Sequence, residues 1–163
     1  MIAAGAFVLT LLVSAVSMAA SGYLIQADLV RSAAGAPQGP VCVPNSVFLP
    51  GEGVVVRARV IDLATGQEVD GPAIQARGIK LQAKIGDLAL DMHYGTHPPE
   101  PDAPAHDEYW TVLWVIPANF PAGVVNWSLV VTDNAGQQGT FQPIGQDIGI
   151  PALMVLPAGA PNA

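Results

Sequence analysis

The chain has 163 residues, of which 17 are glycine and 15 are proline, and its formal net charge is −7 at pH 7. This share of turn-forming residues disfavours a helical protein and suits short strands joined by turns. All Lys and Arg residues lie at or before Lys84, and the acids that follow it are Asp87, Asp91, Glu100, Asp102, Asp107, Glu108, Asp133 and Asp147. An acidic half without basic side chains argues against binding to nucleic acid or anionic lipid, and favours cations or basic partner surfaces.

The first 27 residues contain no charged side chain, and Asp28 is the first. The apolar run over residues 2–20 ends in small residues, which is the pattern of a secretory signal peptide and predicts cleavage after Ala19. The alternative is an uncleaved membrane anchor, because residues 2–25 are long enough to span a bilayer. A buried helix of a soluble protein is a third interpretation, which the absence of a polar face disfavours. We therefore expect an exported protein, periplasmic or extracellular, cleaved or held by this helix.

The rest of the chain is the size of one domain. Residues 28–40 are turn-rich and without periodicity, which predicts a linker, and residues 41–156 form the predicted domain. Residues 157–163 are expected to be a disordered tail. The single cysteine, Cys42, excludes an internal disulfide, and its valine neighbours predict a small buried hydrophobe.

Short runs of β-type residues alternate with turn signals along the domain. The predicted strands are Val41–Phe48, Val54–Asp62, Gly78–Ile85, Leu88–Tyr94, Glu108–Ile116, Val124–Thr132, Gln137–Pro143 and Ala152–Leu156. In Val54–Asp62, alternate valines share one face, and Arg57 and Arg59 share the other. One face is therefore expected to be buried and the other exposed to solvent. No amphipathic helix is expected after the export segment. The pattern predicts an all-β fold, an antiparallel sandwich of about seven to eight strands.

Alternation also assigns faces within the later strands. Trp110 and Trp114 share a face, and we expect them in the core rather than on a carbohydrate-binding platform. In Leu88–Tyr94 the apolar residues point inward, so Asp91 and His93 are expected to emerge together on the opposite face, about 7 Å apart.

Turn and strand motifs resemble those of bacterial immunoglobulin-like and fibronectin-III-like domains. The residues that carry the resemblance are Pro50-Gly-Glu-Gly-Val-Val-Val-Arg-Ala-Arg-Val60, Trp114-Val-Ile-Pro-Ala-Asn-Phe-Pro-Ala-Gly123 and Val131-Thr-Asp-Asn-Ala-Gly136. The resemblance covers residues 41–156 and implies a β-sandwich without implying an activity. The pair of bridged cysteines of antibody domains is absent.

All three histidines lie between residues 93 and 106. His93, His97 and His106, with Asp91 and Asp107, offer imidazole and carboxylate groups that zinc or copper(II) prefers. The alternative is that the polar, proline-rich loop Gly95–Glu108 shapes a structural or partner-binding surface.

Signatures of serine hydrolases, Cys–His enzymes and P-loop proteins are missing, so no catalytic residue and no organic cofactor is predicted. Asp107 and Glu108 are adjacent on a strand and point to opposite faces, so they cannot flank one glycosidic bond. We expect a non-catalytic binding or accessory module, such as a small subunit of a membrane or cell-envelope complex. The alternative is a periplasmic copper- or zinc-binding protein using the histidine loop.

Overall fold

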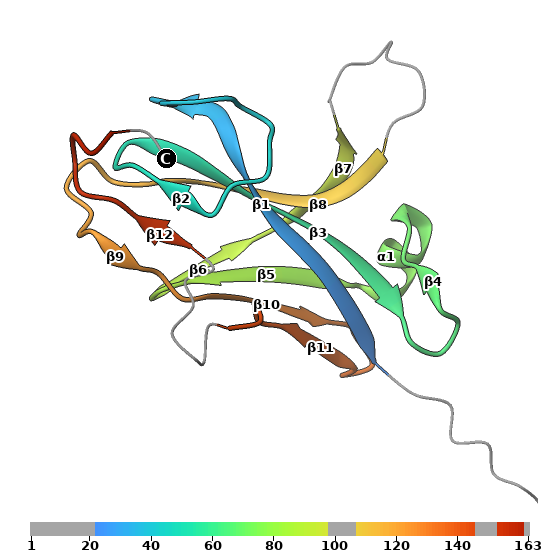
Figure 1. The fold of residues 1–163 in the computed structure, drawn as a ribbon. Helices are drawn as coiled ribbons and strands as arrows, with labels where there is room; N and C mark the ends of the chain where they lie inside the picture. The colour runs from blue at the N-terminus through green and yellow to red at the C-terminus, as the bar shows by residue number, and fades with distance from the viewer. Residues whose placement is uncertain (1–21, 98–106, 146–152, 162–163) are drawn as a thin grey trace, which may run out of the picture.

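The computed structural model describes residues 22–97, 107–145 and 153–161. These residues form an all-β fold with mainly antiparallel sheets and one short helix (Figure 1). The arrangement is compatible with the β-sandwich predicted from the alternation pattern. Among the described residues, no helix is long and apolar enough to cross a membrane.

Two larger sheets and one small sheet make up the fold. Sheet A contains, in spatial order, β1 (Tyr23–Gly35), β3 (Glu52–Asp62), β8 (Asp107–Val115) and β7 (His93–His97), with β4 (Gln67–Glu68) paired to β3. Sheet C contains β11 (Gln138–Phe141), β10 (Trp127–Thr132), β5 (Lys80–Ile85) and β6 (Leu88–Asp91). Sheet B contains β2 (Val47–Phe48), β12 (Met154–Val155) and β9 (Gly123–Val124), and only its β2–β12 pair is parallel.

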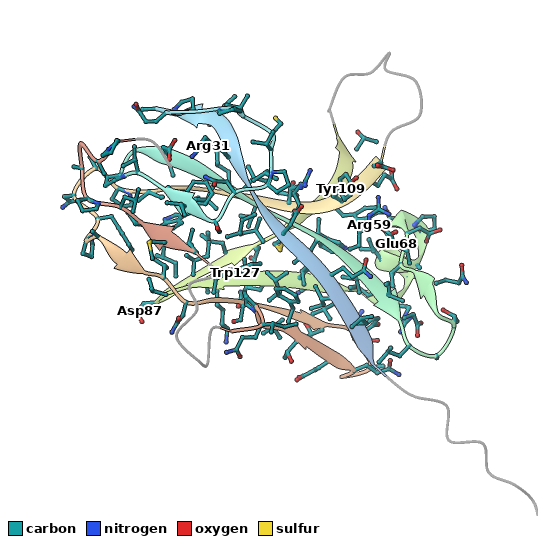
Figure 2. The ribbon with its side chains drawn as sticks, viewed as in Figure 1. Arg31, Arg59, Glu68, Asp87, Tyr109 and Trp127 are labelled. Atoms are coloured by element: carbon teal, nitrogen blue, oxygen red, sulfur yellow. The ribbon has the colours of Figure 1, made fainter. Side chains whose placement is uncertain are left out.

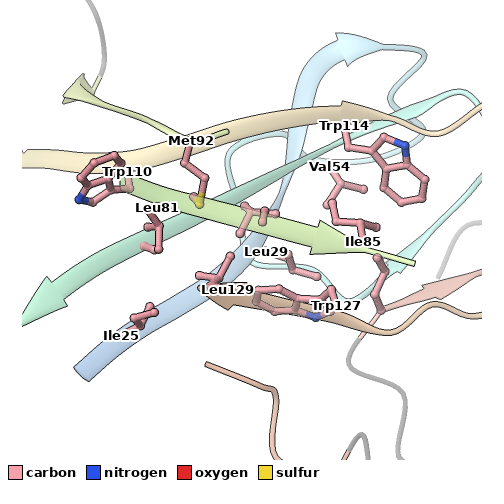
Figure 3. Packing of buried hydrophobic residues seen from close by; sticks show 14 of the residues in the cluster. Ile25, Leu29, Val54, Leu81, Ile85, Met92, Trp110, Trp114, Trp127 and Leu129 are labelled. Carbon is pink, nitrogen blue, oxygen red and sulfur yellow. The ribbon is translucent and has the colours of Figure 1, made fainter. Parts of the chain in front are cut away.

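The apolar faces of sheets A and C meet in one core (Figure 3). Sheet A contributes Trp110 and Trp114, which are 4% and 6% exposed, and the alternate valines of β3. Sheet C contributes Leu81, Leu129 and their neighbours at alternate positions. The prediction that both tryptophans belong to the core is therefore confirmed, because strands with a period of two bury one complete face.

Strand β1 overlaps two predicted segments that are not strands. Tyr23–Gly35 pairs antiparallel with β3, and its inward residues Ile25 and Leu29 are 3% and 6% exposed. The predicted linker over residues 28–40 is therefore wrong up to Gly35, and a spanning helix cannot extend to residue 25. The sequence pattern does not predict this strand because small residues weaken the apolar–polar alternation of β1. Its partner strand also lies about thirty residues later in the chain. Residues 1–21, with the predicted cleavage point, lie outside the described part.

The predicted strand Leu88–Tyr94 is two strands in different sheets. β6 pairs with β5 in sheet C, whereas β7 pairs with β8 in sheet A. The chain changes sheets at Met92, whose N–H donates to Leu81 O at 2.9 Å and whose side chain is buried between the sheets. Leu88, predicted to point inward and be buried, is 45% exposed.

The segment before β2 is mostly irregular, although Val41–Phe48 is predicted to be a strand. Residues 42–45 run along the outer edge of β1, where Cys42 N–H donates to Arg31 O at 2.7 Å and Asn45 N–H to Leu29 O at 2.9 Å. Cys42 is exposed and has a left-handed φ of 59°. The prediction of a buried Cys42 is wrong, because its segment covers the edge of β1 from outside rather than contributing to the core.

Helix α1 (Gly71–Arg77) is short, and none of its residues is fully buried. Its ends are defined by capping: Asp70 Oδ1 accepts the N–H of Ala73 at 3.0 Å, and Gly78 closes the helix with a φ of +61°. A helix of this kind has no long apolar periodicity, which is why no amphipathic helix is predicted there.

The C-terminal segment is more ordered than predicted. β12 lies within the predicted strand Ala152–Leu156, and Ala160 N–H donates to Pro157 O at 3.0 Å in a turn. Disorder over the whole of residues 157–163 is therefore not correct; residues 162 and 163 lie outside the described part.

An ion pair is buried where β1, β3 and the segment before β2 meet. Arg31 Nε lies 2.9 Å from Glu52 Oε1, and the two side chains are 7% and 0% exposed. The angle at Nε is poor for a hydrogen bond, so this contact is mainly electrostatic. Glu52 also accepts the N–H groups of Leu49 and Gln38, both at 2.7 Å, and Arg31 Nη2 donates to Val47 O at 3.3 Å. These bonds fasten the irregular segment onto the core.

A polar cluster closes the end of the fold where β1 begins. Tyr23 OH donates to Asp133 Oδ2 at 2.7 Å, and Arg77 pairs with Asp62 and lies 3.5 Å from Asp133 Oδ2. Burial, together with the bond to Asp133, raises the pKa of Tyr23 to about 12. The hydrogen bond from Arg77 lowers the pKa of Asp62, and the bond from Tyr23 lowers that of Asp133.

We expect Arg77→Gln to make the protein more sensitive to acid. Asp62 and Asp133 have folded-state pKa values below their unfolded values, so they stabilise the fold above about pH 4 and lose this contribution as the pH falls. Without the guanidinium, the pH midpoint of acid unfolding should rise by up to about one unit. Circular dichroism against pH measures it, with Arg59→Gln, at an exposed pair, as the control. Equal pH midpoints in the Arg77 variant and the parent chain would contradict the stabilising role of Arg77 beside Asp62 and Asp133.

Candidate binding surface on sheet A

The outer face of sheet A carries two arginines and a tyrosine in neighbouring rows. Arg57 and Arg59 alternate with buried residues of β3, and Tyr109 lies on the adjacent strand β8. The guanidinium carbons of Arg59 and Arg57 lie 4.8 and 5.8 Å from the centre of the Tyr109 ring. Figure 2 shows Arg59, Tyr109 and Glu68 gathered at this side of the molecule. Such stacking favours a cation over the ring face and restrains all three side chains.

The two arginines differ in how firmly they are held. Arg57 makes a two-pronged contact with Asp28, with Nε to Oδ1 at 2.9 Å and Nη2 to Oδ2 at 2.5 Å, and this hydrogen bonding raises its pKa. Arg59 is 37% exposed and has longer contacts, 3.3 Å to Glu68 and 3.5 Å to Asp107. Exposed ion pairs of this length contribute little to stability. Arg59 is therefore held less firmly by ion pairs than Arg57, and it is more exposed to a partner.

An acidic cleft of about 470 Å³ adjoins Arg59 between β4 and the β7–β8 hairpin. Its carboxylates are those of Glu68, Asp70, Asp107 and Glu108. Tyr94 OH donates to Glu108 Oε2 at 2.9 Å, and burial, with this bond, raises the pKa of Tyr94 well above its usual range. With four carboxylates and one guanidinium, the cleft favours basic groups over acidic ones.

The structure separates the predicted metal ligands Asp91 and His93. Asp91 lies in sheet C and accepts a hydrogen bond from Gln82 Nε2 at 3.1 Å, whereas His93 lies in sheet A opposite Thr111. The prediction that they share a face is wrong, because the chain changes sheets between them.

The β7–β8 hairpin places two other predicted metal ligands at paired positions of neighbouring strands. His97 is the cross-strand backbone partner of Asp107. Asp107 Oδ2 accepts a hydrogen bond from Tyr109 OH at 2.8 Å. His93 is four residues from His97 on the same strand, a separation of about 13 Å along the backbone. His106 lies outside the described residues. Within the described ranges, no group of three or more His, Cys, Asp or Glu side chains has the geometry to hold a metal ion.

Sequence reasoning missed the central residue of this surface. Tyr109 occupies an outward position in β8, opposite in phase to Trp110 and Trp114, so the alternation itself contained the signal. Its proximity to Arg57 and Arg59 depends on the β3–β8 register, which places Arg57 opposite Thr111. That register joins residues about fifty positions apart and is not readable from either strand alone.

Compared with protein-family models, curated proteins and solved structures, the chain matches none of them.

Proposed function

We propose that this chain is an exported, non-catalytic binding module with an immunoglobulin-like sandwich, acting as an accessory subunit of a membrane or cell-envelope complex. The observation that carries the proposal is the outer face of sheet A over β3 and β8. It presents Tyr109 beside Arg57 and Arg59 and, further along the same face of β8, Leu113 and Val115, which are 44% and 45% exposed. Tyrosine and arginine are enriched where protein interfaces concentrate their binding energy, and uncovered aliphatic side chains beside them add apolar area.

The immunoglobulin-like part of the proposal rests on the roles of the motif residues. In the Pro-Gly-Glu turn, Glu52 is buried and accepts two backbone N–H groups. In the Thr-Asp-x-x-Gly turn between β10 and β11, Asp133 Oδ1 accepts the N–H groups of Ala135 and Gln137, both at 2.9 Å. Both motifs thus stabilise turns of the sandwich, which explains them without invoking an active site.

The cellular location is inferred from the composition of the segment that precedes β1. β1 begins at Tyr23, directly after an uncharged apolar segment, and the predicted cleavage after Ala19 leaves β1 complete. The partner is expected to be a protein with basic groups near the acidic cleft, because Glu68, Asp107 and Glu108 flank the Tyr109 surface.

Site-specific cross-linking tests the proposal. A photo-reactive phenylalanine analogue at Tyr109 in the full chain should give one discrete adduct in the producing cells. The same analogue at Lys84, an exposed outward position of sheet C, is the matched control and should not give that adduct. Adding Arg59→Ala should weaken the adduct at Tyr109, since Arg59 stacks on this residue. Equal adducts at both positions, or none at Tyr109, would overturn the proposal.

A further inference from the structure

Among the described residues, one half of β8 is a free sheet edge. β7 pairs with β8 only from Asp107 to Thr111, because the chain before His93 has crossed to sheet C (Figure 1). In the described part of the chain, no strand lies beside β8 from Val112 to Val115 on the side away from β3.

The register shows which backbone groups this edge exposes. Ile116 N–H donates to Glu52 O at 2.9 Å, so even-numbered residues of β8 direct their N–H and C=O groups to β3. Leu113 and Val115 therefore direct theirs away from β3, toward the free side. Neither residue has a described backbone partner there. An unpaired row of this kind is a template for an added strand.

The side chains around the edge are also uncovered. On the outer face, Leu113 and Val115 are 44% and 45% exposed. On the inner side, Leu88 of β6 is opposite Ile85, which is 2% exposed, so Leu88 shares the core-facing side of sheet C. Leu88 is nevertheless 45% exposed. An added strand beside β8 would lie against the exposed Leu113 and Val115 side chains of the outer face.

Charge indicates which kind of strand fits. β6 and β8 carry Asp91, Asp107 and Glu108 and no Lys or Arg, and Asp87 precedes β6. A second copy of this chain carries the same net charge of −7 and would be repelled by it. A segment with an apolar centre would match the exposed aliphatic side chains, and basic ends would match the acidic charge.

We propose that the Leu113–Val115 edge of β8 binds an extended segment of a partner protein by strand addition, with apolar residues at its centre and Lys or Arg at its ends. This proposal rests on the proposed function, because it specifies the chemistry of the partner that the module binds. The two proposals can fail separately, because one is tested by peptide binding at Leu113 and Val115 and the other by cross-linking at Tyr109.

Hydrogen exchange of the full chain tests the edge directly. The probe is a short valine-rich peptide with lysines at both ends, and the matched peptide has glutamates in their place. With the lysine peptide, exchange at the Leu113 and Val115 amides should slow by about tenfold or more. The amides of Thr111 and Trp114, directed to β7 and β3, serve as internal references.

Two substitutions separate strand addition from general apolar binding. Leu113→Lys places a positive charge on the edge and should weaken binding of the lysine peptide by about tenfold or more. Leu63→Lys, at an equally exposed leucine in the β3–β4 turn, should leave its affinity unchanged. The glutamate peptide should bind more weakly than the lysine peptide to the parent chain.

Three results would overturn the proposal. The first is unchanged exchange at Leu113 and Val115 with the lysine peptide, and the second is equal loss of affinity in both leucine variants. The third is protection of these two amides before any peptide is added, which would assign the edge to a second copy or to another segment of this chain.

Discussion

A chain that begins at Ala36 is expected not to fold, whereas one that begins at Ala20 folds like the full sequence. The shorter chain lacks β1, which supplies Tyr23, Ile25 and Leu29 to the core, all 6% exposed or less. Burying side chains of this size contributes about 1.5–3 kcal/mol each, so their combined loss approaches the whole stability of a small domain.

The loss of β1 also removes Arg31 and leaves Glu52 buried without its cation. We expect no cooperative thermal transition and no dispersed amide spectrum for the Ala36 chain, measured by circular dichroism and NMR. The Ala20 chain is the matched control, since it keeps every residue of β1. A cooperative transition in the Ala36 chain would show that β1 is an appendage rather than part of the core.

Breaking the Arg31–Glu52 pair is expected to give the largest effect of any single polar substitution in the described fold. Glu52→Ala leaves Arg31 charged and buried and frees the N–H groups of Leu49 and Gln38. Removing one partner of a buried ion pair costs about 3–5 kcal/mol, measured as the free energy of unfolding in urea. Arg31→Ala should lose a similar amount, because Glu52 is then the uncompensated charge.

The double variant Arg31→Met, Glu52→Leu separates the charge effect from the packing effect. Replacing both charges by apolar groups of similar volume should recover much of the stability lost in either single variant. Arg59→Ala is the control at an exposed pair and should change stability by about 0–1 kcal/mol. If the double variant is as unstable as the sum of the single variants, the residues act independently and the pair is not a coupled element.

The predictions from sequence were most accurate where one strand buries one face. β3, β5, β8 and β10 all lie within or within two residues of the predicted ranges, and their inward residues form the core. Trp127, Leu129 and Val131 illustrate this, with exposures of 4%, 0% and 0%. A period of two is a local property, so adjacent residues suffice to predict it.

The predictions failed where a residue's surroundings come from distant parts of the chain. Arg31 is expected in a linker, but β3 and the loop before β2 enclose it with Glu52. Asp91 and His93 are expected on one face, but the burial of Met92 between two sheets separates them. No local pattern distinguishes a continuous strand from one that changes sheets, because both alternate in the same way.

By itself, the sequence determined the all-β class, the faces of the main strands, the core tryptophans and the uncharged segment before the fold, because periodicity and composition act over a few neighbouring residues. Only the tertiary structure decided that β1 belongs to the core, that Cys42 is exposed, that Tyr109 meets Arg57 and Arg59, and that half of β8 is an unpaired edge among the residues that the structure describes. The physical reason is that these features depend on the pairing register between strands far apart in the chain, and register is specified by the packing of the whole core.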